Sequence, residues 1–121
     1  NGDGCFQMNG QELATAVQHK LNVIFLVIDN GMYGTIRMHQ ERNYPARVHG
    51  TDLVNPDFAA LARAYGANGE TVTRTAEFAP ALERALAADR PSLLWLKIDP
   101  QAITMSATID QIRAQHPDRM Q

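Results

Sequence analysis

The chain has 121 residues, of which 45% are hydrophobic and 20% are charged, and its formal net charge is −2. This length and composition fit one globular domain with a single core. The charge excludes the basic field that nucleic-acid-binding and membrane-surface proteins use, and the apolar run at 23–28 is too short to span a bilayer. Cys5 is the single cysteine, so no disulfide can form within the chain, which fits a reducing cytoplasm.

The chain opens on a polar turn, Gly2-Asp3-Gly4, with no initiator methionine and no apolar segment before it. A turn of this kind normally follows a strand. We therefore expect residues 1–121 to be a single partial domain, truncated at its N-terminus. A helix is predicted from Asn9 to Lys20, because Asn9 and Glu12 have the spacing of a capping box and apolar residues follow at helical spacing.

The strongest predicted strand is the continuous apolar run at 23–28, which has the pattern of a strand buried on both faces. It ends at the polar turn Asp29-Asn30-Gly31. A short helix is predicted over 34–41. The segment 43–56 is predicted to be a loop, because prolines and a glycine interrupt it.

Helices and strands alternate through the second half of the chain. Asn55 or Asp57 can cap a predicted helix that ends at Gly66. Further elements follow in this order: a weak strand over 70–73, a helix capped by Thr75 and closed by Pro91, a strand over 92–98 and a short helix near 107–115. This alternation, with continuously apolar strands, predicts an α/β fold in which a parallel sheet has helices on both faces.

Two polar turns lie where an open parallel sheet binds its ligands, beyond the carboxyl ends of strands. The turn at 2–5 and the turn at 29–34 meet if the first is delivered beside strand 23–28. Asp3 offers a carboxylate and Asn30 an amide oxygen, while the glycines expose backbone groups. Such oxygens suit Mg²⁺ with phosphate. The residues also allow two ordinary turns, because both turn sequences are common.

Gly2-Asp3-Gly4, followed after 24 residues by Asp29-Asn30, closely resembles the thiamine-diphosphate signature, in which GDG is followed at about that distance by NN. The likeness extends over nearly the whole chain, including Glu12 to Ala16, Gly31 to Arg37, Asn55 to Phe58, and Ala64-Tyr65-Gly66. The chain thus resembles the C-terminal, pyrophosphate-binding domain of the acetolactate synthase, benzoylformate decarboxylase and pyruvate decarboxylase family.

The resemblance implies a binding site for magnesium and for the diphosphate of the cofactor. Asp3 and Asn30 would coordinate Mg²⁺ through side-chain oxygens, and Met32 through its backbone carbonyl. The residues expected around the cofactor are Gly2, Gly4, Cys5, Gly31, Tyr33 and Gly34. Asp29 departs from the family pattern, which has asparagine there. That position is not the usual metal ligand, but an added negative charge there could change metal affinity.

The resemblance implies no catalytic residue within this chain. In the family, thiamine diphosphate attacks the carbonyl carbon of a 2-oxo acid and carbon dioxide leaves. The activating glutamate belongs to a separate N-terminal domain, usually donated by a second subunit of a homodimer or tetramer. We therefore expect this chain to anchor thiamine diphosphate and Mg²⁺ in a cytoplasmic, acetolactate synthase-like lyase or transferase, and to be inactive alone.

Two other classes of protein are considered. A nicotinamide- or flavin-binding Rossmann unit would need a G-x-G-x-x-G motif after a strand, and no such spacing occurs. The remaining alternative is a noncatalytic interaction module that binds phosphate or a nucleotide.

The histidines do not have metal-ligand spacing. We expect His19 at the surface, His39 as a candidate for lining the substrate side, and His49 and His116 in a loop and in the tail. Among other polar residues, Glu12 is expected to be structural, and Arg37 and Gln40 to face either substrate or solvent. Trp95 is expected in the core.

Overall fold

A parallel sheet forms the centre of the first of two compact units in the chain. The structure, a computed structural model, describes residues 1–115. The first unit comprises Asn1–Asp29 and Asn55–Ile98, and the second comprises Asn30–Val54 and the chain from Asp99 onward.

Within the described residues the sheet has three strands, all parallel, in the order β1-β3-β2. These are β1 (Ile24–Asp29), β2 (Asn68–Val72) and β3 (Ser92–Lys97). Ser92 at the start of β3 pairs with the first residue of each neighbouring strand. The predicted strands at 23–28, 70–73 and 92–98 are therefore confirmed, with small shifts at their ends.

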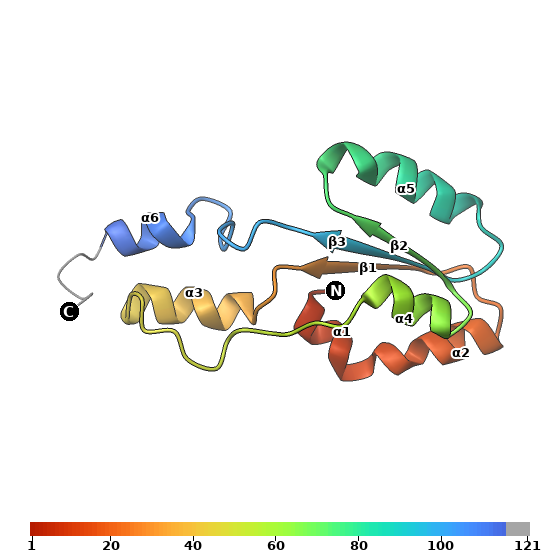
Figure 1. Ribbon diagram of the computed structural model, residues 1–121, viewed down its shortest axis with the longest axis horizontal. Helices are drawn as coiled ribbons and strands as arrows, with labels where there is room; N and C mark the ends of the chain where they lie inside the picture. The colour runs from red at the N-terminus through yellow and green to blue at the C-terminus, as the bar shows by residue number, and fades with distance from the viewer. Residues whose placement is uncertain (116–121) are drawn as a thin grey trace. The chain divides into compact units, whose positions relative to one another are not determined.

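Helices cover both faces of this sheet (Figure 1). Helix α5 (Thr75–Ala87) lies on one face, and α4 (Phe58–Ala64) and α1 (Asp3–Asn9) lie on the other. Successive residues of β3 point to opposite faces, so Leu93 packs into the core on the α4 side and Leu94 into the core on the α5 side. The predicted α/β fold, a parallel sheet with helices on both faces, is confirmed.

Three aromatic rings fill the core between α1, α4 and β3. The ring of Phe58 meets Phe6 edge-on, with the centroids 5.4 Å apart, and meets Trp95 in the same way at 5.7 Å. Such pairs add about 0.5–1.5 kcal/mol each beyond the free energy of burial. This contact ties the helix that begins at Asp3 to the centre of the sheet.

Helix α4 approaches β2 closely at a glycine. A Cβ atom on Gly69 would lie 2.1 Å from the carbonyl oxygen of Ala59, so no side chain fits there. Asp57 caps α4 by accepting a hydrogen bond of 2.7 Å from the Ala60 N–H, as predicted. The chain leaves the helix through Gly66, whose φ of +90° is a conformation that favours glycine.

The first helix begins earlier than predicted, and the predicted capping box at Asn9 and Glu12 is wrong. Asn9 makes no side-chain cap. Three short helices follow one another instead: α1 (Asp3–Asn9), a 3₁₀ turn (Gly10–Glu12) and α2 (Leu13–Gln18). The path changes at Asn9, whose φ of −146° is not helical, and a Cβ atom on the next residue, Gly10, would lie 2.8 Å from the buried ring of Phe6.

The described part of the second unit contains the helices α3 (Gly34–Asn43) and α6 (Ile109–Ala114), which pack together. Helix α6 begins with a capping box, because Thr108 and Gln111 each accept a hydrogen bond from the other's backbone N–H. Ile109 and Ile112 are buried on one side of α6. The predicted helices at 34–41 and 107–115 are confirmed.

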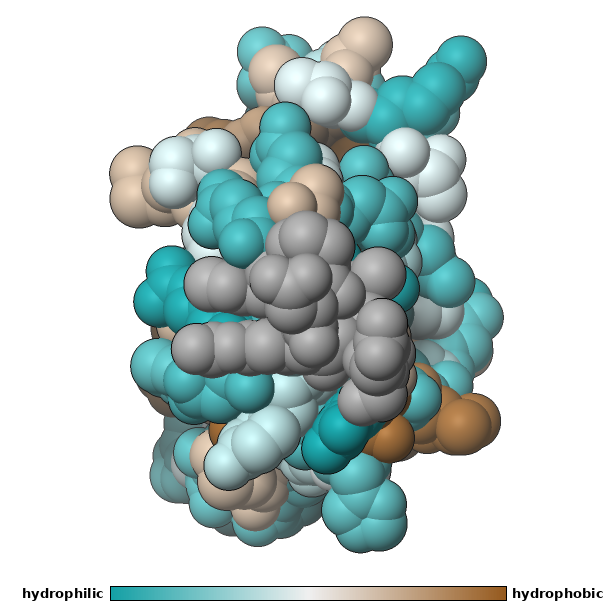
Figure 2. Space-filling model, turned by 90° about the vertical axis from the view of Figure 1, so that its left-hand side faces the viewer, coloured by the Kyte–Doolittle hydropathy of each residue, from teal (hydrophilic) through white to brown (hydrophobic). Residues whose placement is uncertain are grey.

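No helix among residues 1–115 is long and apolar enough to cross a membrane. The face drawn in Figure 2 is mainly hydrophilic, with apolar side chains interspersed among polar ones. Single exposed apolar residues, such as Met8 in the first unit and Val54 in the second, are normal on a protein surface.

Candidate functional site

The Gly2-Asp3-Gly4 segment lies at the carboxyl end of β1. Gly2 forms a parallel bridge with Ile28, whose N–H donates to the carbonyl of Asn1 at 2.8 Å. The chain therefore runs beside β1 for two residues, and α1 starts directly after them. This places Asp3 at the end of the sheet where β1 finishes with Asp29, in agreement with the predicted position of the first turn.

A single asparagine amide joins two buried carboxylates at this end of the sheet. The Nδ2 atom of Asn55 donates to Oδ2 of Asp3 at 2.7 Å and to Oδ1 of Asp29 at 2.8 Å. Asp3 is 3% exposed and Asp29 is 8% exposed. Gln7 lies one turn after Asp3 on α1, and its Nε2 donates to Oδ1 of Asn55 at 2.7 Å.

Asp29 has a second donor, the indole N–H of Trp95. The distance from Nε1 to Oδ2 of Asp29 is 2.7 Å, so each oxygen of this carboxylate accepts a hydrogen bond. A buried carboxylate is costly unless it is hydrogen-bonded, and charge-assisted bonds of this kind are the strong ones. The structure thus gives Asp29, where the family pattern has asparagine, a structural role. Trp95 is in the core, as predicted.

The loop at 30–34 in the second unit contains the remaining predicted site residues. Gly31 has a φ of +69°, which favours glycine. Oδ1 of Asn30 accepts a hydrogen bond from the Met32 N–H at 3.2 Å. Gly34 leaves room for the Asn30 amide, since a Cβ atom there would lie 2.8 Å from Nδ2. The two glycines therefore allow Asn30 to turn its amide oxygen toward the Met32 backbone.

An antiparallel bridge between Met32 and Asp52 holds this loop. Its two hydrogen bonds, both 2.8 Å long, are made by the residues on either side of Met32. In a pair of this type the central residue's own N–H and carbonyl point away from the partner strand. The Met32 carbonyl therefore points to the side on which its N–H meets Asn30, an orientation that suits the predicted carbonyl ligand.

The predicted ligands of Mg²⁺ are all oxygens, and this chemistry fits the ion. No group of three or more His, Cys, Asp or Glu side chains that could hold a metal occurs in the described part of the chain. A metal bound here would thus depend on amide and backbone oxygens as well as on a carboxylate. Mg²⁺ accepts such ligands and completes its shell with phosphate oxygens and water. Asp3 belongs to the first unit, and Asn30 and Met32 to the second, so their binding of one ion stays a prediction.

The residues predicted around the diphosphate lie in the same two segments. Gly4 and Cys5 are in the first turn of α1, where N–H groups have no acceptor within the helix. Cys5 is exposed. Tyr33 is 44% exposed and directly precedes α3. Contact of these residues with a diphosphate stays a prediction, as does that of Gly2, Gly31 and Gly34.

Helix α3 carries a buried carboxylate that two arginines hold. The Glu41 side chain is 1% exposed, and it accepts hydrogen bonds from Arg37 at 2.8 Å, from Arg113 at 2.7 and 2.8 Å, and from the Ala46 N–H at 2.9 Å. Burial alone raises the pKa of Glu41, but the hydrogen bonds from Arg113, Ala46 and Arg37 together lower it from 4.5 to about 2. Arg37 also donates to Asp52 at 3.1 Å, so the cluster connects α6 and α3 to the segment that holds Met32.

The prediction that Arg37 faces substrate or solvent is wrong, because this residue is buried in the Glu41 cluster. Gln40 also makes an internal contact, since its Nε2 donates to the His49 carbonyl at 2.7 Å. The sequence alone does not reveal the partner of Gln40, but Glu41 lies four residues after Arg37 on the predicted helix, a spacing at which an ion pair forms. His39 is exposed, and its predicted place near a substrate stays a prediction.

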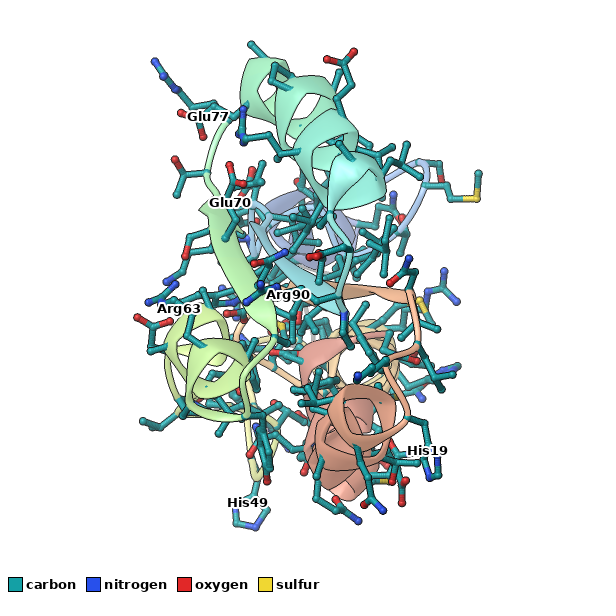
Figure 3. The ribbon with its side chains drawn as sticks, turned by 90° about the vertical axis from the view of Figure 1, so that its right-hand side faces the viewer. His19, His49, Arg63, Glu70, Glu77 and Arg90 are labelled. Carbon is teal, nitrogen blue, oxygen red and sulfur yellow. The ribbon has the colours of Figure 1, made fainter. Side chains whose placement is uncertain are left out.

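His19 is at the surface, as predicted, and Glu12 makes a local contact other than the predicted capping box. His19 is exposed and projects from the end of α2 (Figure 3). Glu12 accepts a hydrogen bond of 2.7 Å from the Thr15 hydroxyl. His116 lies outside the described residues.

A pocket of 360 Å³ lies at the opposite end of the sheet. Asn68 and Ser92, the first residues of β2 and β3, line it, and so do Glu70 of β2 and Arg63 of α4, both labelled in Figure 3. Arg63 donates to the Gly69 carbonyl at 2.7 Å, and Glu70 pairs with an arginine of α5. Open parallel sheets bind ligands at their carboxyl ends, so this pocket at the amino ends of the strands receives no role in the site.

Asn55 is the residue of the site that sequence reasoning missed. Its position before Pro56 favours an extended backbone, and it precedes the cap residue Asp57, so its local pattern is that of a helix start. The one available signal was its place in the Asn55-to-Phe58 segment of the family resemblance.

Comparison with known proteins identifies related domains. The sequence model described as "Thiamine pyrophosphate enzyme, C-terminal TPP binding domain" matches residues 1–96. The chain is 39% identical over 100 residues to the large subunit of acetolactate synthase isozyme 2 of Escherichia coli, covering 82% of this chain and 18% of that protein. It is 35% identical over 100 residues to an acetolactate synthase of Arthrospira platensis, covering 81% of this chain and 17% of that one.

Two solved structures resemble the fold. Benzoylformate decarboxylase from Polynucleobacter necessarius superimposes with a TM-score of 0.74 at 34% identity, covering 82% of this chain and 19% of that one. A thiamine diphosphate-dependent 4-hydroxybenzoylformate decarboxylase of Rhodococcus jostii gives a TM-score of 0.75 at 33% identity, covering 81% of this chain and 19% of that chain. The chain spans less than a fifth of the length of each of these four relatives.

These relatives carry the names of enzymes, which favours the enzyme interpretation over a noncatalytic phosphate- or nucleotide-binding module. The match to the family model covers well over half of the chain, and it includes both polar turns and all three strands except the last residue of β3. The chain therefore belongs to the family of C-terminal thiamine pyrophosphate-binding domains of thiamine pyrophosphate enzymes.

Proposed function

We propose that this chain anchors thiamine diphosphate and Mg²⁺ in an enzyme that acts on a 2-oxo acid, by decarboxylation or by acetolactate synthase-like carboligation. The observation that carries this proposal is the position of Asp3. Its buried carboxylate is held at the carboxyl end of β1, and β1 leads directly into the Asn30–Gly34 loop. The names of the relatives support the same class of reaction.

In this proposal the chain's oxygens hold the metal and its backbone holds the phosphates. Asp3 and Asn30 supply side-chain oxygens to Mg²⁺, and Met32 supplies its carbonyl. Gly4 and Cys5 donate to diphosphate oxygens the backbone N–H groups that have no acceptor within the helix. Tyr33 and Gly34 close over the phosphates, and Gly2 and Gly31 allow the backbone to approach closely.

The chain's contribution to the reaction is binding and orientation. Thiamine diphosphate, when bound, supplies a carbon nucleophile for the 2-oxo acid carbonyl and accepts electrons as carbon dioxide leaves. By fixing the diphosphate, this chain would hold the reactive ring at a constant distance from residues supplied elsewhere, and such positioning contributes strongly to catalysis.

The rest of the enzyme lies outside this chain in the proposal. The activating carboxylate would come from an N-terminal pyrimidine-binding domain of a second subunit, in a cytoplasmic homodimer or tetramer. Residues 1–121 would then be one part of a larger polypeptide and have no activity alone.

The test is a thermal shift measurement on the full-length protein. Thiamine diphosphate with Mg²⁺ is expected to raise the melting temperature, while NAD or ATP with Mg²⁺ is not. A ligand at a hundred times its dissociation constant stabilises the folded state by about 2.7 kcal/mol, which such a measurement resolves. Carbon dioxide release from pyruvate or benzoylformate then tests the reaction class.

Two variants and one control connect the shift to the proposed site. Asp3→Ala and Asn30→Ala are expected to remove most of the Mg²⁺-dependent shift. Asp89→Ala removes a carboxylate whose side chain is 90% exposed, and it should leave the shift unchanged. Stabilisation by ATP alone, or a full thiamine diphosphate shift in Asp3→Ala, would contradict the proposal.

A further inference from the structure

The side-chain hydrogen bonds of Asn55 connect α1 to β1 in the first unit. Its amide lies between Asp3 at the start of α1 and Asp29 at the end of β1, and its own backbone lies just before α4. Trp95 of β3 binds the far oxygen of Asp29. One half-buried side chain thus links α1 to β1, and Asp29 extends this network to β3.

The chemistry of the amide suits this position. An asparagine NH₂ group has two N–H donors, and each carboxylate here takes one of them. If the amide were turned over, its oxygen would face two carboxylates and the contacts would be repulsive. Gln7 fixes the same orientation, because its Nε2 donates to the asparagine oxygen. The direction of the amide is therefore determined by all three neighbours.

The aspartate at position 29 places a second buried carboxylate beside Asp3, and the Asn55 amide donates to both. Two buried carboxylates share one donor nitrogen here, and carboxylate oxygens without a donor between them repel each other. Donors between them and on the far side of Asp29 offset this repulsion. Trp95 and Asn55 each donate to one oxygen of Asp29, which fixes the direction of this carboxylate.

The contact with Asp3 fixes the orientation of the proposed metal ligand. Asn55 donates to Oδ2 of Asp3, and an ionised carboxylate has acceptor sites on both oxygens, so this bond is compatible with coordination of a cation. Partners that hold a ligand in this way typically change metal affinity by about 10–100-fold when they are removed. Because Asp3 is buried, few water molecules can reach its carboxylate, and its orientation depends on protein donors such as Asn55.

We propose that Asn55 is the positioning residue of the magnesium site: its amide orients the Asp3 carboxylate toward the ion and keeps the Asp29 carboxylate directed at Trp95. This inference rests on the proposed function, because it assumes that Asp3 binds Mg²⁺. Gln7 has a supporting role, because its bond to Oδ1 of Asn55 keeps the Asn55 NH₂ group directed at the two carboxylates.

The experiment measures Mg²⁺ binding by the full-length protein without relying on turnover. Melting temperature is recorded against Mg²⁺ concentration at saturating thiamine diphosphate, for wild type, Asn55→Ala and Gln7→Ala. Asn68→Ala is the matched control, since its Nδ2 makes a single 3.3 Å hydrogen bond to Ser92 at the other end of the sheet. The rise of melting temperature with Mg²⁺ concentration gives the Mg²⁺ dissociation constant. We expect this constant to increase about 10–100-fold in Asn55→Ala, by a smaller factor in Gln7→Ala, and not at all in Asn68→Ala.

The melting temperature without Mg²⁺ separates positioning from stability. A purely structural role would lower that temperature in Asn55→Ala and leave the Mg²⁺ dissociation constant at the wild-type value, which would overturn the inference. If Asn55→Ala does not fold, the Gln7→Ala variant tests the positioning role instead. Gln7 is exposed, so its replacement by alanine leaves the core intact. Unchanged Mg²⁺ binding in Gln7→Ala would then overturn it.

A failure of the proposed function gives a different result. In that case the wild-type protein itself has no Mg²⁺-dependent response to thiamine diphosphate, and both proposals fall. A normal wild-type response with unaltered Asn55 and Gln7 variants removes only the positioning role.

Discussion

Replacing Glu41 by glutamine should lower the free energy of local unfolding of α3 and α6 in the second unit. The pKa of this carboxyl group is lowered from 4.5 to about 2 by its hydrogen bonds, so its ionised form stabilises the folded state. At about 1.4 kcal/mol per pKa unit, the loss of this charge is worth about 3 kcal/mol. Glutamine would also leave Arg37 and Arg113 without their shared anion, and removing one partner of a buried ion pair has a similar cost.

Hydrogen exchange of the full-length protein measures this effect locally. Amides of α3 and α6 in the Glu41→Gln variant should exchange about a hundredfold faster than in wild type at neutral pH. Because the pKa of Glu41 is lower in the folded state, its contribution is complete above pH 4.5 and is lost as the pH falls toward 2. The difference between the two proteins should therefore shrink through that range.

Asp110→Asn is the matched control for this variant. Asp110 also faces Arg113, but at 4.0 Å and with a side chain that is 73% exposed, so the pair should contribute less than about 0.5 kcal/mol. Equal effects of the two substitutions, or unchanged exchange in Glu41→Gln, would refute the reasoning from burial.

Three further predictions concern stability and are measured by chemical denaturation of the full-length protein. The hydroxyl of Thr51 is buried with no hydrogen-bond partner among the described residues, so Thr51→Val should stabilise by about 1 kcal/mol, and a loss of stability would reveal a missed partner. Gly69→Ala should destabilise by several kcal/mol, because the new Cβ would lie 2.1 Å from the Ala59 carbonyl oxygen; a neutral effect would mean that α4 can shift. Asp57→Ala removes the bond to the Ala60 N–H and should cost about 1 kcal/mol, whereas no loss would disprove the cap.

The elements that the sequence predicts correctly have local causes. The apolar run at 23–28 and the strand at 92–98 are hydrophobic at successive positions, which is what burial on both faces of a sheet requires. Asp57 caps α4 because its side chain reaches an N–H three residues later. Such features depend on residues that are close in the sequence, so a local sequence pattern is enough to predict them.

The contacts that the sequence does not reveal are long-range. Glu41 and Arg113 are 72 positions apart, and Asn55 lies 52 positions from Asp3. No periodicity encodes such pairs. Arg37 is a different case, because Glu41 lies four residues later on the same predicted helix, and this spacing is a local signal for their ion pair. The start of α1 was also missed, because Asn9 and Glu12 have the spacing of a cap while the packing of Phe6 continues the helix back to Asp3.

Trp95 offers an optical probe of this part of the molecule. It is the single tryptophan of the chain, its ring lies 4.1 Å from the ammonium nitrogen of Lys97, and its indole N–H is bound to Asp29. Indole fluorescence responds to the polarity and charge around the ring. A change in the position of the Asp29 carboxylate would consequently shift the emission of Trp95. The fluorescence of this buried residue would therefore report on structural changes at the carboxyl end of β1.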